Sequence, residues 1–208
     1  MARLTLPATK GNLLRLQGEH QLAVEALTFL DEKRDLLLSE ILRLQGQAAR
    51  FRRQVEQALA VAFEHLTEGL LTLGSEAVAR AALGVTGDDV VALTERAFLG
   101  MPMPEVEFRP GRNRPQFSFG GTVSALDRCH LTVRQALGRV AALAEAEAIL
   151  WRLAEELKHT VRRSNALSYM IIPTFRETIH YLESALEERE REALFHLKRA
   201  KARRARGG

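Results

Sequence analysis

The chain has 208 residues, 46% apolar and only 6% aromatic, with a formal net charge of +4 and a pI near 9.6. Its richness in leucine, alanine, glutamate and arginine argues against a sheet protein and predicts an elongated all-α fold. The lone Cys129 excludes an internal disulfide framework, and no apolar run approaches the ~18 residues of a membrane span, so we expect a cytoplasmic protein without direct membrane insertion.

The first predicted element is a coiled-coil helix over residues 10–73. No proline interrupts it, and apolar residues recur in alternate steps of three and four. Thirteen of the fifteen seam positions are apolar, where the average composition would give about seven, and the two exceptions, His20 and Arg34, are expected to set the register. The seam consists of Leu13, Leu16, His20, Ala23, Leu27, Leu30, Arg34, Leu37, Ile41, Leu44, Ala48, Phe51, Val55, Ala58 and Ala62.

Further apolar residues stand beside this seam, so the predicted apolar face is broader than a two-stranded coiled coil needs. Something else is therefore expected to cover it, either the protein's own middle region or another chain. The extra positions include Leu14, Leu22, Leu36, Leu42, Val61, Phe63, Leu70 and Leu71.

Residues 74–121 form a predicted small head that holds four of the six prolines. Two short helices are expected in it, Ser75 to Leu83 and Asp88 to Phe98, each opened by its first side chain as an N-cap. A β-hairpin is predicted over residues 106–119, where apolar and polar residues alternate on both sides of a Pro-Gly turn. The residues expected to face one another across it are Val106 and Phe108 with Phe117 and Phe119.

The second long helical span is predicted over residues 122–206, with Pro173 as its only proline. Apolar residues recur at helical spacing on both sides of that proline. The simplest use of two long seams in one chain is to bury each against the other. We therefore expect an antiparallel two-helix coiled coil whose turn-around is the head, as one elongated unit over residues 1–208.

No motif indicates a catalytic, metal or cofactor site. The six histidines follow no metal-ligand spacing, and the phosphate-loop, dinucleotide and nucleophile-elbow signatures are missing, so we expect no catalytic residue, no metal ligand and no cofactor. The closing segment is basic without acids, which is typical of binding to nucleic acid or anionic surfaces, and equally of a solvated helix end. Its cations are Lys198, Arg199, Lys201, Arg203, Arg204 and Arg206.

Both terminal stretches resemble a known family. Residues 6–41 read LPATKGNLL and then LDEKRDLL, and residues 162–201 read RRSNALSYMIIP, then EERERE and LKRAK. These strings are similar to the patterns of the D subunit of the rotary V-type (V/A-type) ATPases and ATP synthases. Family members usually have a basic residue where Asp31 stands, a valine at Ser164 and a glutamate at Ser168, and Ala8 interrupts their Pro-Thr pair. The chain is therefore identified as a divergent member.

The resemblance implies a central rotor shaft. Its paired terminal helices would insert into a ring of catalytic A and non-catalytic B subunits, the F subunit would bind lower on the shaft, and a further subunit would link the foot to the membrane rotor ring. Nucleotide chemistry would occur on the A subunits. This chain would then be a non-catalytic subunit on the cytoplasmic face of the membrane that transmits torque and couples ATP hydrolysis or synthesis to ion transport, with no nucleic acid among its partners.

Clustered cations are the expected contacts between shaft and ring. Exposed ion pairs are individually weak, ~0.2 to 1 kcal/mol, so they could be exchanged between successive ring subunits without deep traps. The predicted contact residues are Arg162, Arg163, Arg189, Arg191, Lys198 and Arg199.

Pro173 is predicted to kink the second long helix, because proline removes a backbone hydrogen bond and clashes with the preceding turn. Ser168 or a water is expected to satisfy the freed carbonyl of Tyr169. The predicted hairpin is expected to tune activity or the docking of neighbouring subunits rather than to hold the helices together.

Two alternatives stay open from the residues alone. One is a non-enzymatic cytosolic coiled-coil scaffold, which would have no ATPase subunits among its partners. The other is a nucleic-acid-binding protein with a basic tail, which requires salt-sensitive binding to DNA or RNA.

Overall fold

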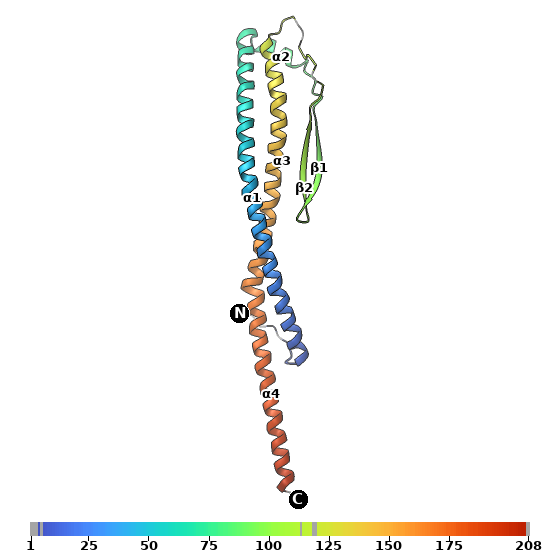
Figure 1. The fold of residues 1–208 in the computed structure, drawn as a ribbon, viewed down its shortest axis with the longest axis vertical. Helices are drawn as coiled ribbons and strands as arrows, with labels where there is room; N and C mark the ends of the chain where they lie inside the picture. Colours follow the sequence, from blue (N-terminus) through green and yellow to red (C-terminus); the bar gives the residue numbers. More distant parts are fainter. Residues whose placement is uncertain (1–3, 5, 113, 118–119, 207–208) are drawn as a thin grey trace. The chain divides into compact units, whose positions relative to one another are not determined.

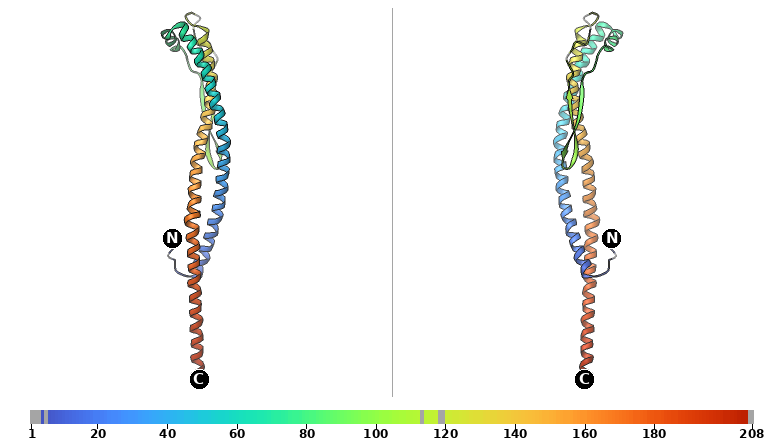
Figure 2. Two further views of the ribbon diagram at one scale, coloured as in Figure 1. Left: turned by 90° about the vertical axis from the view of Figure 1, so that its left-hand side faces the viewer. Right: turned by 90° about the vertical axis from the view of Figure 1, so that its right-hand side faces the viewer.

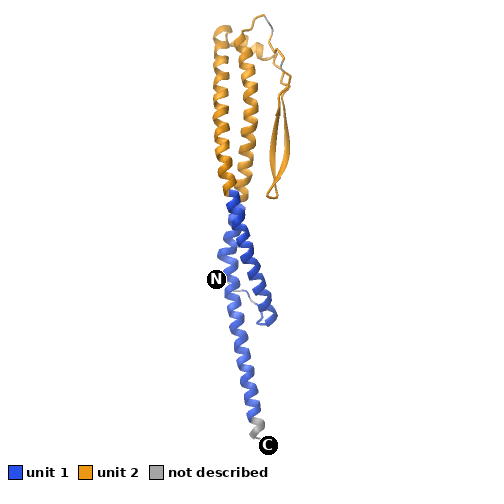
Figure 3. Cartoon of the chain, in the orientation of Figure 1, with its two compact units in different colours: residues 1–37, 157–208 blue, residues 38–156 orange. Residues whose placement is uncertain are grey.

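A computed structural model describes residues 4, 6–112, 114–117 and 120–206 (Figure 1). Helices α1 and α2 come first, two strands follow, and α3, a π-helical segment η1 and α4 complete the chain. Two compact units result, one from residues 1–37 with 157–208 and one from residues 38–156 (Figure 3). The bounds are α1 Lys10–Leu73, α2 Ser75–Ala82, β1 Val90–Phe98, β2 Met101–Arg109, α3 Ser124–Ala166, η1 Leu167–Ile171 and α4 Ile172–Arg206.

Helix α1 has the bounds that the heptad pattern predicts, and its seam is confirmed. All fifteen predicted seam positions, including His20 and Arg34, are buried or half-buried. Leu16 and Leu37 are almost completely buried, whereas Leu14 and Leu36 beside the seam are exposed. The narrow seam therefore forms the helix contact, and the wider apolar face stays open to solvent within this chain.

In the unit of residues 1–37 and 157–208, α1 runs antiparallel to its partner helix. Lys10 Nζ lies 2.7 Å from Glu190, Gln17 Nε2 donates to Glu183 at 3.2 Å, and Ser164 Oγ donates to Asp31 at 3.0 Å. Residue numbers thus rise on α1 as they fall on the partner. The apolar core of this pairing contains Ala8, Leu16, Leu182, Leu13, Phe175, Ile179 and Ala185.

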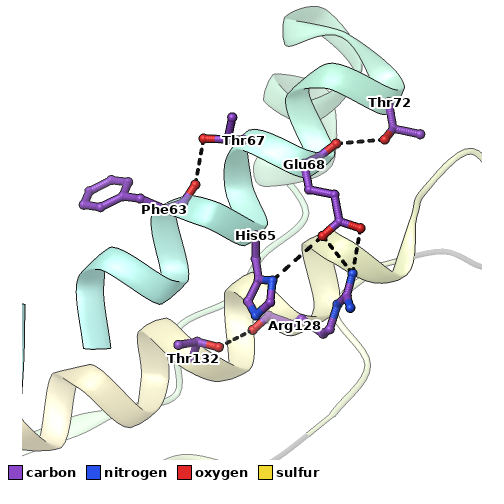
Figure 4. Close-up of polar contacts among 7 residues, drawn as sticks. All are labelled: Phe63, His65, Thr67, Glu68, Thr72, Arg128 and Thr132. Carbon is purple, nitrogen blue, oxygen red and sulfur yellow. Dashed lines mark hydrogen bonds and ion pairs between the residues drawn. The ribbon is translucent and has the colours of Figure 1, made fainter. Parts of the chain in front are cut away.

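In the unit of residues 38–156, α1 and α3 pair in the same antiparallel sense. Arg52 Nη2 lies 2.7 Å from Glu147. Nearer the end of α1, Arg128 Nη2 reaches both carboxylate oxygens of Glu68 at 2.8 and 2.9 Å, as Figure 4 shows. The predicted antiparallel helix pairing is therefore confirmed in each unit, while the single elongated unit stays a prediction.

The head differs from its prediction after the first short helix. Helix α2 exists, but its N-cap is Gly74 rather than Ser75. The predicted helix from Asp88 to Phe98 is wrong, because those residues form strand β1. The predicted hairpin over residues 106–119 is also wrong, because the hairpin pairs β1 with β2.

The hairpin turn is a two-residue loop, Leu99 and Gly100, between the paired Phe98 and Met101. Both loop residues have positive φ, 48° and 79°, which is the geometry of a type I′ turn. Such turns usually contain Asn-Gly or Asp-Gly, so a Leu-Gly dipeptide does not predict a hairpin turn.

Two prolines, Pro102 and Pro104, lie inside β2 without breaking the ladder. The residues that flank a two-residue loop form a hydrogen-bonded pair, and such pairs alternate along the strands. Since Pro102 and Pro104 pair with Ala97 and Glu95, they fall at sites whose backbone nitrogen points away from β1. A proline at these sites removes no hydrogen bond from the hairpin.

The hairpin runs alongside the helices of its unit (Figure 2), and β2 makes its contacts with α3. The backbone N–H of Val106 donates to Glu145 at 3.1 Å, and Arg152 donates to the carbonyl of Pro102. Gly138 lets the ring of Phe108 approach α3, since a Cβ there would meet the ring at 3.4 Å. Val106 and Phe108, predicted to face Phe117 and Phe119, therefore pack on α3 instead; Phe119 lies outside the described residues.

Pro173 is the second residue of α4, one residue after the end of η1. The N–H of Ile172 donates to the carbonyl of Leu167, five residues earlier, so the ladder widens just before the residue that lacks an N–H. Thr174 Oγ1 donates to the carbonyl of Met170 at 2.6 Å. The expectation is that Ser168 or a water satisfies the carbonyl of Tyr169, so this hydroxyl contact involves a different donor and a different carbonyl. A π-turn accommodates the proline, and the predicted kink stays a prediction. No helix among the described residues is apolar over a stretch that would cross a membrane.

Candidate functional site

The described side chains contain no cluster of three or more His, Cys, Asp or Glu placed to hold a metal ion. A cavity of about 550 Å³ lies in the head, lined by residues such as Gln116, Phe117, Asp127 and His130. His130 stacks edge-on against Phe117 with ring centroids 6.2 Å apart, and its Nε2 is buried. Burial raises the pKa of the neighbouring Cys129 thiol, which disfavours the reactive thiolate. The candidate functional sites described below are exposed surfaces of the helices.

The last part of α4 extends past the helix that pairs with it. Its final contacts to α1 and the preceding segment come from Arg189, which donates to the carbonyl of Ala8 at 2.7 Å, and from Glu190, which pairs with Lys10. From residue 187 to residue 202 every residue is exposed. The exposed residues include large apolar ones, Leu194, Phe195 and Leu197, the last 66% exposed. A helix end with this composition fits insertion into a partner.

The six predicted contact cations fall in two groups. Arg162 and Arg163 are exposed on α3, whereas the other four lie on α4. Arg189 makes the internal contact to Ala8, and Arg191 forms an i,i+4 ion pair with Glu187 at 3.5 Å. Lys198 and Arg199 are exposed at the end of α4. Four of the six, namely Arg162, Arg163, Lys198 and Arg199, are thus available for partners without breaking a described ion pair.

A second exposed apolar surface lies on α3 in the unit of residues 38–156. Leu137, Val140, Ala144 and Trp151 recur at helical spacing on one side, away from the buried Leu153. Trp151 is 78% exposed. Sequence reasoning missed this surface, although the single tryptophan outside the predicted seam was a usable signal.

A third exposed apolar surface occurs at η1. Tyr169 is 71% exposed and Met170 is 68% exposed, and Ile171 follows them. Ile172 separates these three residues from Pro173. Sequence reasoning treated this stretch as an interrupted seam and missed its exposure, because nothing in the local pattern shows that the helix gains a residue there.

An ion pair fixes the base of the hairpin. Arg134 Nη2 lies 2.9 Å from Asp89, which also accepts from the N–H of Gly111 at 2.8 Å. Arg134 further donates to the carbonyl of Gly111 at 2.7 Å. The Gly111 N–H and the Arg134 guanidinium hold the pKa of Asp89 below its ordinary value. The segment after β2 is thereby fastened to α3 and to the start of β1.

Comparison with known proteins assigns the family. Residues 12–202 match the family model that describes the D subunit of ATP synthase. The chain is 34% identical over 98% of its length to the complete D subunit of the V-type ATP synthase of Thermotoga neapolitana. It is 37% identical over 96% of its length to the D subunit of the A-type ATP synthase of Thermococcus sibiricus, covering 94% of that protein. The resemblance of the two terminal stretches is confirmed, and the chain belongs to the family of ATP synthase D subunits.

Proposed function

We propose that this chain is the central rotor shaft of a V/A-type ATPase or ATP synthase, transmitting torque between a ring of A and B subunits and the membrane rotor. The observation that supports this most directly is the exposed end of α4, which combines large apolar residues with Lys198 and Arg199 beyond the last contact to α1. Exposed apolar side chains of this kind mark interaction sites, and a narrow helix end fits the inside of a ring of subunits.

Coupling follows from symmetry and from differential contact. Two antiparallel helices cannot have threefold symmetry, so each of three catalytic sites in a ring would meet a different side of the shaft. Contacts that differ between sites bias each site among its conformations, and rotation would change which site receives which contact. In this proposal the chain itself is non-catalytic, and nucleotide chemistry belongs to the A subunits.

Other partners would use the remaining surfaces. The apolar side of α3 around Leu137 and Trp151 is suited to a helix of the F subunit, because it repeats at helical spacing. A further subunit would link the shaft to the membrane rotor ring, which places the chain peripherally at the cytoplasmic face. The hairpin of β1 and β2 would tune activity or docking, because its described attachments to α3 lie along β2 and at the base of the hairpin.

Neutralising the predicted contact cations tests the proposal. The variant replaces Arg162, Arg163, Arg189, Arg191, Lys198 and Arg199 by glutamine in a complex assembled from all subunits. Each lost contact is worth ~0.2 to 1 kcal/mol, so we expect roughly tenfold or greater loss of ATP-driven rotation and ion transport. A matched control neutralises six exposed cations of the other unit, Arg50, Arg53, Arg80, Arg96, Arg112 and Arg114.

The outcome is read from co-purification and single-molecule rotation. The proposal holds if the wild-type chain co-purifies with the A and B subunits, rotates, and loses coupling in the first variant but not in the control. A wild-type chain that does not co-purify with them would overturn it.

A further inference from the structure

We propose that the exposed surface at η1 binds a protein surface of a ring subunit in which carboxylates lie beside apolar side chains. We call it the π-turn face; it consists of Tyr169, Met170, Ile171, Arg162, Arg163 and Arg176. The inference rests on the proposed function, since it names the partner chemistry of one part of the shaft.

The π-turn face exists because the helix contains one extra residue there. Buried or half-buried positions normally alternate in steps of three and four along a seam. The buried Thr160, Ser164 and Ile172 and the half-buried Ser168 stand at three successive steps of four. The α1 seam opposite keeps its regular spacing. The surplus residue cannot enter the seam, so side chains between Ser168 and Ile172 are displaced outward.

The backbone holds this insertion in place. The N–H of Ile172 reaches back five residues to the carbonyl of Leu167, and the next residue, Pro173, has no N–H with which to restore the α-helical ladder. The hydroxyl of Thr174 donates a hydrogen bond to the carbonyl of Met170. The exposure of Tyr169 and Met170 is therefore built into the fold, and π-turns of this kind are frequent at functional sites.

The opposing stretch of α1 exposes apolar residues at the same level of the helix pair. The hydrogen bonds of Gln17 with Glu183 and of Asp31 with Ser164 bracket this level on both sides. Between them α1 exposes Leu22, Val24 and Phe29, the first and last each at 65%. A soluble monomer rarely exposes so many large apolar side chains within about 20 Å of helix, which indicates a covered surface in the assembled state.

The charges of the π-turn face define the chemistry of its partner. Elsewhere along the helices arginines pair with carboxylates, as Arg43 does with Glu40 and Arg52 with Glu147. Among the described residues, Arg162, Arg163 and Arg176 make no ion pair. Glu177 is the only acid between residues 160 and 182. Three cations around an apolar centre favour a partner with carboxylates, and they oppose a second copy of the same face.

Photo-crosslinking identifies the occupant. The probe is a photoreactive phenylalanine replacing Tyr169 in the fully assembled complex, followed by mass spectrometry of the crosslinked peptides. We expect crosslinks to ring-subunit peptides that contain Asp or Glu, in yields about tenfold above those from the same probe at Leu71, which is 84% exposed in the other unit. Crosslinks only to a second copy of this chain, or yields no higher than at Leu71, would overturn the inference.

Substitution gives an independent readout. The variant combines Tyr169→Ser, Met170→Ser and Arg176→Glu, and its control combines Leu71→Ser, Leu83→Ser and Arg80→Glu, which are exposed in the other unit. We expect the first variant to fold with unchanged melting temperature and to bind the ring about tenfold more weakly, while the control binds normally. Equal binding of both overturns the inference alone, whereas a wild-type chain that never joins the complex overturns the proposed function.

Discussion

At the scale of single residues, Gly111 is the tightest position in the head. A Cβ at Gly111 would lie 2.4 Å from the Cβ of Asp88 and 2.7 Å from its carbonyl carbon and oxygen. Backbone atoms cannot rotate away as a side chain can, so Gly111→Ala must shift the hairpin base. We expect a loss of roughly 1 to 3 kcal/mol in the free energy of unfolding, measured by chemical denaturation.

The matched control for that change is Gly87→Ala. No atom lies within 4 Å of a Cβ built on Gly87, so this alanine should be neutral or slightly stabilising. Equal unfolding free energies for the two alanine variants would contradict the predicted clash.

Asp89 makes the stability of the head depend on pH. Its pKa is lowered in the fold by the N–H of Gly111 and by Arg134, so the folded state favours the carboxylate. That stabilisation is present above the ordinary pKa of 3.8 and is lost as the pH falls through the lower folded pKa. We therefore expect Asp89→Asn to melt at a lower temperature than the wild type at pH 7, and the gap to close in acid.

The exposed Asp127 provides the control for this titration. Asp127→Asn should lower the melting temperature at pH 7 less than Asp89→Asn does, because Asp127 is exposed in the first turn of α3 and no described ion pair depends on it. A melting gap for Asp89→Asn that is the same at pH 7 and in strong acid would show that the charge of Asp89 contributes nothing.

At the scale of elements, Pro173 is expected to set the direction of α4. Replacing it with alanine restores an N–H and removes the ring clash, so Pro173→Ala should straighten the helix. Spin labels on Lys158 and Glu187, which are exposed on either side, would report a longer distance in the variant by pulsed electron resonance. Arg176→Ala in the same helix is the control. An unchanged distance would mean that η1 alone fixes the helix direction.

Helix α1 could be predicted from the sequence, whereas the position of the hairpin could not. The α1 seam was predictable because burial of Leu16, Leu37 and their equivalents follows from local periodicity. The hairpin was misplaced because a Leu-Gly turn and prolines inside β2 are poor signals, while Pro110-Gly111 imitates a turn. The α1 helix can be predicted from its local apolar periodicity. The position of the hairpin turn depends on which two segments pair as strands, and the local sequence does not show that.

The candidate surfaces were less predictable than the elements. The end of α4 could be found from its composition, because Lys198 and Arg199 stand in a basic run. The exposure of Tyr169 could not, because it depends on a one-residue surplus relative to the opposite helix. The pair of Asp89 and Arg134 spans 45 residues, so only the fold brings it together.

At the scale of the whole molecule, the two roles of α4 can be separated by truncation. Stopping the chain after Glu190 keeps the contacts of Lys10 and Ala8 and removes only residues beyond them. We expect the melting temperature to stay unchanged while ATP-driven rotation is lost in the assembled complex. Truncation that leaves rotation intact would show that the exposed end of α4 transmits no torque, and a large fall in melting temperature would show that it stabilises the fold.

The hydrogen bond between Asp31 and Ser164 has a consequence for exchanging parts between relatives. The structure joins the two side chains at 3.0 Å across the two helices. A hybrid whose last helix carries an apolar side chain at position 164 would lose this hydrogen bond and leave Asp31 its ion pair with Arg34. A graft of one helix alone keeps this contact only where the donor helix supplies a matching partner, so a graft that carries both helices together is the one expected to preserve it.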